Sequence, residues 1–239
     1  MSMNSPASGT PATVRPVQRI DTESAAFAGW LTSAFVWMFL GLLLTGAVGW
    51  FTLSNQTILE KVTGLYLPII IAQLAVGFGL GLAITRINAT IATLLFFVYA
   101  ATMGVTIAVI IYAMGYEATT VAAAAVATGG MFGGAAVYGL VTKRNLASLG
   151  GYLVMALIGI IIASLVNMFI GWQTLNFIIS VAGVVIFTGL TAYDVQQIAS
   201  GRLAAWLGPD KGAIFGAFQL YLNAINIFLY LLRIFGGSR

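Results

Sequence analysis

The chain has 239 residues, of which 60% are hydrophobic and only 7% are charged. Soluble globular proteins carry about 25% charged residues, so this composition excludes a soluble domain and indicates an integral membrane protein. The absence of cysteine and histidine excludes thiol nucleophiles, histidine-based triads and the usual zinc sites. The net charge is +4, and the basic residues form no cluster dense enough to bind nucleic acid.

The amino-terminal residues 1–24 differ from the rest of the chain. They are rich in Ser, Pro, Thr and Ala, with Pro6, Pro11 and Pro16 among them. Such a segment has too little apolar surface to fold, so we predict a disordered cytoplasmic tail. A cleaved signal peptide is not expected, because the apolar run that follows is longer than the hydrophobic region of such a peptide. Residues 25–239 form the predicted membrane domain.

Seven apolar segments follow the tail, each close to the ~20 residues that an α-helix needs to cross ~30 Å of hydrocarbon. They are too long and too unbroken for the alternating strands of ~10 residues found in membrane barrels. The predicted fold class is therefore all-α, an integral membrane bundle of seven transmembrane helices. The segments cover about 27–51, 63–84, 89–112, 119–141, 149–170, 175–198 and 212–235.

Lysine and arginine are divided unequally between the two sides of these segments. Cytoplasmic loops carry the excess of Lys and Arg, so the richer side indicates the cytoplasm. This distribution predicts a cytoplasmic amino terminus and, after seven spans, an outer carboxy terminus. The richer side holds Arg15, Arg19, Arg86, Lys143, Arg144, Arg202 and Lys211, and the other side holds Lys61, Arg233 and Arg239.

The fourth segment contains a run of small residues, with Gly129, Gly130, Gly133 and Gly134 in two overlapping small-xxx-small pairs. Small residues allow helix backbones to approach closely in lipid. Packing within one bundle is the favoured interpretation, and a dimer interface is the alternative.

One carboxylate lies inside a membrane-length segment. Asp194 is near the end of the sixth segment, and the other acidic residues lie in the tail or between segments. An ionisable group in a spanning helix costs at least ~2.5–3.5 kcal/mol on insertion scales, so it indicates a functional site. The alternative is a carboxylate close enough to the helix end to reach water.

Arg86 is expected at the same depth as Asp194. The second and sixth segments both run inward, and Arg86 ends the second. We therefore consider a latch, in which pairing of the two closes the cytoplasmic mouth and protonation of Asp194 releases it. The alternative is an Arg86 side chain that reaches up to lipid headgroups.

The seventh segment carries three amides, Gln219, Asn223 and Asn226, which share a helix face at spacings of three and four. An unpaired amide in lipid costs several kcal/mol, so this face must contact protein or water. Two interpretations stay open, a polar cavity shared with Asp194 and hydrogen bonding between helices. Asn167 in the fifth segment is a weaker candidate of the same kind.

Several stretches together resemble one known family. They are Gly189-Leu-Thr-Ala-Tyr-Asp194-Val-Gln, Leu220-Tyr-Leu-Asn223-Ala-Ile-Asn226-Ile-Phe, Leu231-Leu-Arg-Ile-Phe-Gly236, Met155-Ala-Leu-Ile-Gly-Ile, Ala163-Ser-Leu-Val-Asn167 and Thr142-Lys-Arg-Asn145. The sequence resembles the Bax-inhibitor family of transmembrane proteins (the transmembrane Bax inhibitor motif group), and is most similar to its bacterial branch. The resemblance covers the whole membrane region and leaves out only the tail.

The resemblance implies a seven-helix bundle with the last helix near its centre and, in several members, a pH-dependent calcium leak. The sensor proposed for the family is a pair of aspartates on the sixth and seventh helices that share a proton, with an arginine latch at the end of the second helix. Asp194 matches the first aspartate and Arg86 matches the latch. Asn223 stands where the second aspartate is expected.

This departure has a physical consequence. Two carboxylates in contact titrate as a coupled pair, whereas an asparagine cannot ionise and can only donate a hydrogen bond to Asp194. Calcium prefers several oxygen ligands with sufficient negative charge, so Asp194 is expected to offer at most a weak calcium site. The implied fold carries over to this chain, and the pH-gated leak does so only in part.

Three functions are compared. The first is a cation leak for calcium or protons, gated around Arg86 and Asp194, in the bacterial cytoplasmic (inner) membrane. The second is a non-transporting membrane regulator that binds a partner such as a membrane quality-control protease. The third, an intramembrane aspartyl protease, requires two carboxylates that share a proton, and the membrane segments offer one, so we do not expect an enzyme. We expect no cofactor, calcium only as a permeant ion, the lipid bilayer as surroundings and no nucleic-acid partner.

Overall fold

A computed structural model describes the backbone of residues 17–237 and the side chains of residues 29–237. Every regular element in this part of the chain is an α-helix. Seven of the helices are long and apolar enough to cross a membrane, namely all except α2 and α8. The predicted all-α class with seven spans is confirmed. The helices are α1 (Val17–Ser54), α2 (Gln56–Gly64), α3 (Tyr66–Ala83), α4 (Ala89–Met114), α5 (Ala118–Val141), α6 (Ala147–Ile170), α7 (Gln173–Ala199), α8 (Arg202–Leu207) and α9 (Pro209–Gly236).

Two boundaries differ from the sequence analysis. Helix α1 begins at Val17, within the range 1–24 that composition predicts to be a tail, and residues 1–16 of that range lie outside the described residues. The start of the predicted second span belongs to α2, a separate short helix. The Asn55 side chain caps α2 by accepting a hydrogen bond from the Ile58 N–H at 3.2 Å. This helix carries Glu60 and Lys61, which suits a surface connection better than a buried span.

The tight connections between spans follow from local sequence. Gly115 ends α4 and Gly171 ends α6, each with a left-handed backbone (φ of 65° and 70°) that glycine adopts without steric cost. Asn88 starts α4 by accepting a hydrogen bond from the Ile91 N–H at 2.8 Å. Of the consecutive spans, α3 packs on α4, α6 on α7 and α7 on α9.

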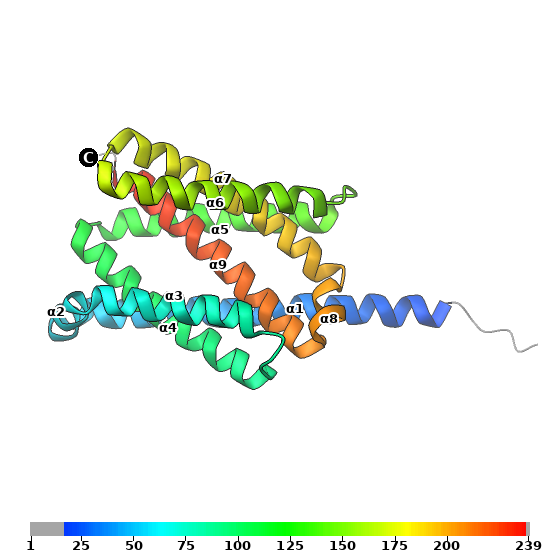
Figure 1. The fold of residues 1–239 in the computed structure, drawn as a ribbon. Helices are drawn as coiled ribbons and strands as arrows, with labels where there is room; N and C mark the ends of the chain where they lie inside the picture. Colours follow the sequence, from blue (N-terminus) through cyan, green and yellow to red (C-terminus); the bar gives the residue numbers. More distant parts are fainter. Residues whose placement is uncertain (1–16, 238–239) are drawn as a thin grey trace, which may run out of the picture.

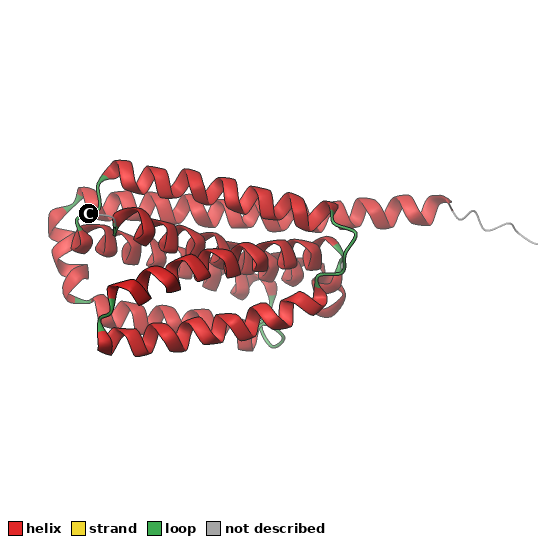
Figure 2. Cartoon of the chain, turned by 90° about the horizontal axis from the view of Figure 1, so that it is seen from above, coloured by secondary structure: helices red, strands yellow, loops and turns green. Residues whose placement is uncertain are grey.

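Helix α9 crosses the molecule diagonally (Figure 1). It packs against α1 and α4 on one side and against α5 and α7 on the other, while α3 packs on α4 and α6 on α7. Of the most apolar stretch of α9, 61% is buried, compared with 11% for α3 and for α6. Figure 2 shows the bundle turned by 90°, with the first turns of α1 extending past the other helices. The bundle thus consists of two helix groups, α1, α3 and α4 in one and α5, α6 and α7 in the other, which are joined through α9 and by direct contact of α1 with α7.

Each group contributes its own apolar core against α9. In the first, the rings of Phe96 on α4 and Tyr221 on α9 meet edge to face, with centroids 5.4 Å apart. In the second, Phe187 on α7 lies 6.0 Å from Tyr230 on α9. Both cores bury the seventh span that carries Asn223.

The prediction that the glycine run of α5 packs within the bundle is wrong. A Cβ built at Gly129, Gly130, Gly133 or Gly134 meets no atom within 4 Å. Close packing of α5 instead occurs at Gly139, where a Cβ would lie 2.4 Å from the Ala192 carbonyl oxygen of α7. The spacing of small residues indicated that α5 packs closely, but it did not indicate which face of α5 makes the contact.

Candidate functional site

Asp194 on α7 and Asn223 on α9 contact each other inside the bundle. Asp194 is 6% exposed and Asn223 is 4% exposed. The Asn223 Nδ2 donates to Asp194 Oδ2 at 2.6 Å. For Asn223, the interpretation as a hydrogen bond between helices therefore describes the structure. The alternative of an Asp194 side chain that reaches open water near the helix end does not fit its burial.

The second oxygen of Asp194 accepts no hydrogen bond from the described residues, and no ion pair to Asp194 is formed among them. Fully buried apolar side chains lie near it in sequence on both helices, Val195 on α7 and Leu220 on α9. The site thus offers one carboxylate oxygen held by an amide and one oxygen without a protein partner.

A polar group missed by the sequence analysis lies two residues beyond Asp194. The Gln196 side chain accepts from the Leu146 N–H at 2.8 Å and donates to the Arg144 carbonyl at 2.9 Å. Leu146 precedes α6 and has no cap of its own side chain, so Gln196 supplies that cap from α7. The sequence signal was a glutamine close after a buried aspartate on the same span.

Arg86 does not lie at the contact between Asp194 and Asn223. It is exposed in the loop between α3 and α4, and it lines a surface pocket of about 430 Å³ with Asp210 and Lys211 from the start of α9. No ion pair joins Arg86 to Asp194 in the described part of the chain. The latch between them stays a prediction.

Asn226 also takes a different place from Asn223. Its Nδ2 donates to the Leu222 carbonyl of its own helix at 2.8 Å. It lines a pocket of about 540 Å³ between α6, α7 and α9, with Asn167, Asn176 and Arg233. Asp194 is not among the residues of that pocket. The amides predicted to share one face of the seventh span therefore lie in two environments, Asn223 against Asp194 and Asn226 in this pocket.

Asn167 has a structural role at the end of α6. Its side chain donates to the Trp172 carbonyl at 3.2 Å and accepts from the Trp172 N–H at 3.1 Å. These two bonds close the turn between α6 and α7, where backbone groups would otherwise lack partners. Both the amide N–H and the amide oxygen of Asn167 are therefore bonded to the backbone of Trp172.

A second buried polar contact ties α9 to the opposite group of helices. Tyr221 Oη and Thr45 Oγ1 of α1 are 2.7 Å apart, and Thr45 Oγ1 also lies 2.8 Å from the Ala100 carbonyl of α4. Tyr221 is fully buried. Asn223 and Tyr221, two residues apart, thus connect α9 to both halves of the bundle.

The described residues contain no group of three or more His, Cys, Asp or Glu side chains placed to hold a metal ion. Calcium takes 6–8 oxygen ligands. Asp194 supplies one carboxylate, and Asn223 already directs its N–H to it. Asp194 and Asn223 together thus offer fewer oxygen ligands than a resident calcium ion takes.

The sequence matches the family described as "Inhibitor of apoptosis-promoting Bax1" over residues 28–239. The match covers all seven spans and includes Arg86, Asp194 and Asn223. The chain belongs to this Bax-inhibitor family. The resemblance recognised from the sequence motifs is confirmed.

Several bacterial proteins are similar to this chain along almost their whole length. The "Inner membrane protein YbhL" of Escherichia coli K12 is 39% identical over 233 residues, which is 95% of this chain and 96% of that protein. An uncharacterized protein of Borreliella burgdorferi is 41% identical over 87% of this chain and 92% of its own length. One from Deinococcus radiodurans is 39% identical over 87% of this chain and 90% of its own.

Proposed function

We propose that this Bax-inhibitor family protein is a pH-sensitive cation leak of a bacterial inner membrane, with calcium or protons as the permeant ions. The observation that carries the proposal is the buried contact between Asp194 and Asn223, which places a carboxylate inside a seven-helix membrane bundle. Ionisable side chains at such depth mark ion pathways in membrane proteins. The bacterial inner membrane follows from the name of the similar YbhL protein.

In this mechanism Asp194 is the gate. Its oxygen without a protein partner is the atom that a proton or a passing cation reaches. Ionised Asp194 attracts Arg86 and the pair closes the cytoplasmic mouth, whereas protonation removes the attraction and opens it. In this proposal, the unlatched form is one in which Arg86 lines the surface pocket together with Asp210.

Asn223 modifies the gate. An asparagine takes up no proton, so a proton at this site has a single carboxylate to bind. The coupled titration of two carboxylates is absent. We therefore expect a shallower dependence of flux on pH than a pair of aspartates would produce, together with weaker attraction for calcium.

The test is calcium flux into liposomes that contain the purified protein, measured with a trapped fluorescent indicator between pH 6 and pH 8. We expect flux in the parent to increase as the pH falls, because protonation of Asp194 releases Arg86. Asp194→Asn removes the charge, so flux should persist and lose its pH dependence.

Glu60→Gln is the matched control, since it removes an exposed carboxylate from α2. It should behave like the parent protein. Identical flux and identical pH profiles in the parent and Asp194→Asn would reject the gate.

A second candidate function is a non-transporting regulator that binds a membrane protein partner. The hydrogen bond between Asp194 and Asn223 favours this second function, because it uses the single carboxylate of the site to link α7 to α9. This function predicts a membrane protein that co-purifies in stable complex and no flux in liposomes of the pure protein. The same flux measurement therefore separates the two.

A further inference from the structure

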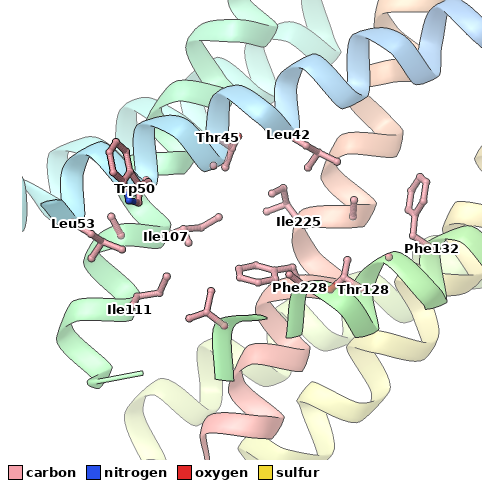
Figure 3. A pocket seen from close by; sticks show the side chains of 17 residues that line it. Leu42, Thr45, Trp50, Leu53, Ile107, Ile111, Thr128, Phe132, Ile225 and Phe228 are labelled. Atoms are coloured by element: carbon pink, nitrogen blue, oxygen red, sulfur yellow. The ribbon is translucent and has the colours of Figure 1, made fainter. Parts of the chain in front are cut away.

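A crevice of about 510 Å³ separates the two helix groups on the side of the bundle where α2 lies. Its walls are α1 and α4 on one side and α5 on the other, and α9 forms its floor (Figure 3). Leu53 and Trp50 lie toward the end of α1, while Thr45 and Leu42 lie deeper. All lining residues belong to membrane-spanning helices.

The length of the crevice equals one leaflet of a bilayer. On α1 it extends from Leu53 to Leu42, and on α5 from Val121 to Phe132. Each stretch is about 16 Å long at the helical rise of about 1.5 Å per residue. Half of the hydrocarbon thickness of a bilayer is about 15 Å. The crevice therefore runs from one membrane surface to the middle of the bilayer.

The crevice of about 510 Å³ is continuous along this leaflet-long stretch. An acyl chain of the surrounding lipid extends over the same depth. Gly46 on α1 and Gly129 on α5 keep the walls open, since a Cβ at either position meets nothing within 4 Å.

The chemistry of the walls matches the same occupant. No charged side chain lines the crevice. The Thr45 hydroxyl is bonded to Tyr221 and to backbone carbonyls, and the Thr128 hydroxyl donates to the Ala124 carbonyl at 2.7 Å. Both hydroxyls are satisfied within the protein, so among the lining side chains only the Trp50 indole N–H, toward the end of α1, keeps a free polar group. The deeper part of the walls is therefore apolar in its available chemistry.

We propose that this crevice binds one acyl chain of a phospholipid from the leaflet on the side of α2. The chain lies between α1 and α5 and contacts Ala224 and Ile225 on α9, immediately after Asn223. Burial of apolar surface and close contact with the walls supply the binding free energy. This site is independent of the proposed ion pathway, because neither Asp194 nor Arg86 lines it.

The experiment uses the full chain in vesicles of phosphatidylethanolamine and phosphatidylglycerol doped with a phosphatidylethanolamine that carries a mid-chain diazirine. After illumination, labelled residues are mapped by peptide mass spectrometry. Ile225 on the floor is only 5% exposed, whereas Phe169 on α6 is 83% exposed to bulk lipid. We expect label at Ile225 or Phe228 as well as at Phe169.

Gly46→Leu and Gly129→Leu fill the crevice from opposite walls and are tested separately, so that either one carries the test if the other fails to fold. Each should lose the label on the floor and keep the label at Phe169. Gly130→Leu is the matched control, because Gly130 is the adjacent residue of α5, has an equally open Cβ position and does not line the crevice.

Two outcomes overturn the proposal. The first is absence of label from the floor in the parent protein, including the case in which cross-linked chains show that a second copy occupies the crevice. The second is label on the floor that is unchanged by both filling substitutions.

Discussion

Asn223 donates its amide N–H to a carboxylate that the bundle excludes from bulk water. Hydrogen bonds to charged groups contribute about 1.5–3 kcal/mol, and a buried carboxylate that loses its partner costs at least as much. Asn223 is therefore important to the fold as well as to the proposed gate. Asn226, one turn away on the same helix, donates instead to the backbone of that helix and provides a comparison.

Replacement of Asn223 by aspartate should restore a coupled pair. In Asn223→Asp, two carboxylates lie within hydrogen-bond distance of each other, and they cannot both ionise at low cost. We expect the pH dependence of liposome calcium flux to become steeper than in the parent.

Asn226→Asp is the control for this substitution. It adds the same charge at a position that does not contact Asp194. A flat pH profile in Asn223→Asp, or equal profiles in the two variants, would contradict the role of the Asp194–Asn223 contact in gating.

At the scale of helices, α5 and α7 are held together at a point that leaves no room for a side chain. Gly139 faces the Ala192 carbonyl of α7, and on the other side of the bundle Gly104 of α4 faces the backbone of α1. Gln196 adds a hydrogen-bonded connection from α7 to the start of α6. These contacts determine how α7, and with it Asp194, is placed.

Gly139→Ala should destabilise the protein. The new Cβ would lie 2.4 Å from a backbone oxygen, so α5 and α7 must separate. Overpacking of this kind costs about 1–3 kcal/mol. A lower melting temperature in detergent would be the readout.

Gly134→Ala on the same helix is the matched control, because its Cβ position is open. It gains helix propensity, worth up to about 1 kcal/mol, without a clash. Equal melting temperatures in the two variants would show that the α5–α7 contact is looser than described.

For the whole molecule, α9 joins two helix groups and the acyl-chain crevice lies between them. The connections fall at two opposite ends of the bundle, with α2 at one end and α8 at the other (Figure 1). The division of Lys and Arg predicts that the end with α8 faces the cytoplasm.

The orientation can be measured directly, since the chain contains no cysteine. Thr57 on α2 and Ser200 after α7 are exposed. In intact cells, a membrane-impermeant maleimide should label Thr57→Cys and should label Ser200→Cys only after permeabilisation. The opposite pattern would reverse the predicted orientation, and the crevice would then open to the cytoplasmic leaflet.

The sequence by itself determined the membrane class, the seven spans, the family and the position of Asp194 near the end of the sixth span. These features are local, because the length and hydropathy of a segment decide whether it crosses a bilayer. The same holds for the turns at Gly115 and Gly171.

The tertiary structure alone decided which side chains meet. It paired Asp194 with Asn223, turned Asn226 to another pocket, placed Arg86 beside Asp210 and opened the crevice along Gly46 and Gly129. The physical reason is that spacing along a helix defines a face but not what the face meets. That depends on the rotation, tilt and closest approach of each helix, which are set by contacts between residues far apart in the chain.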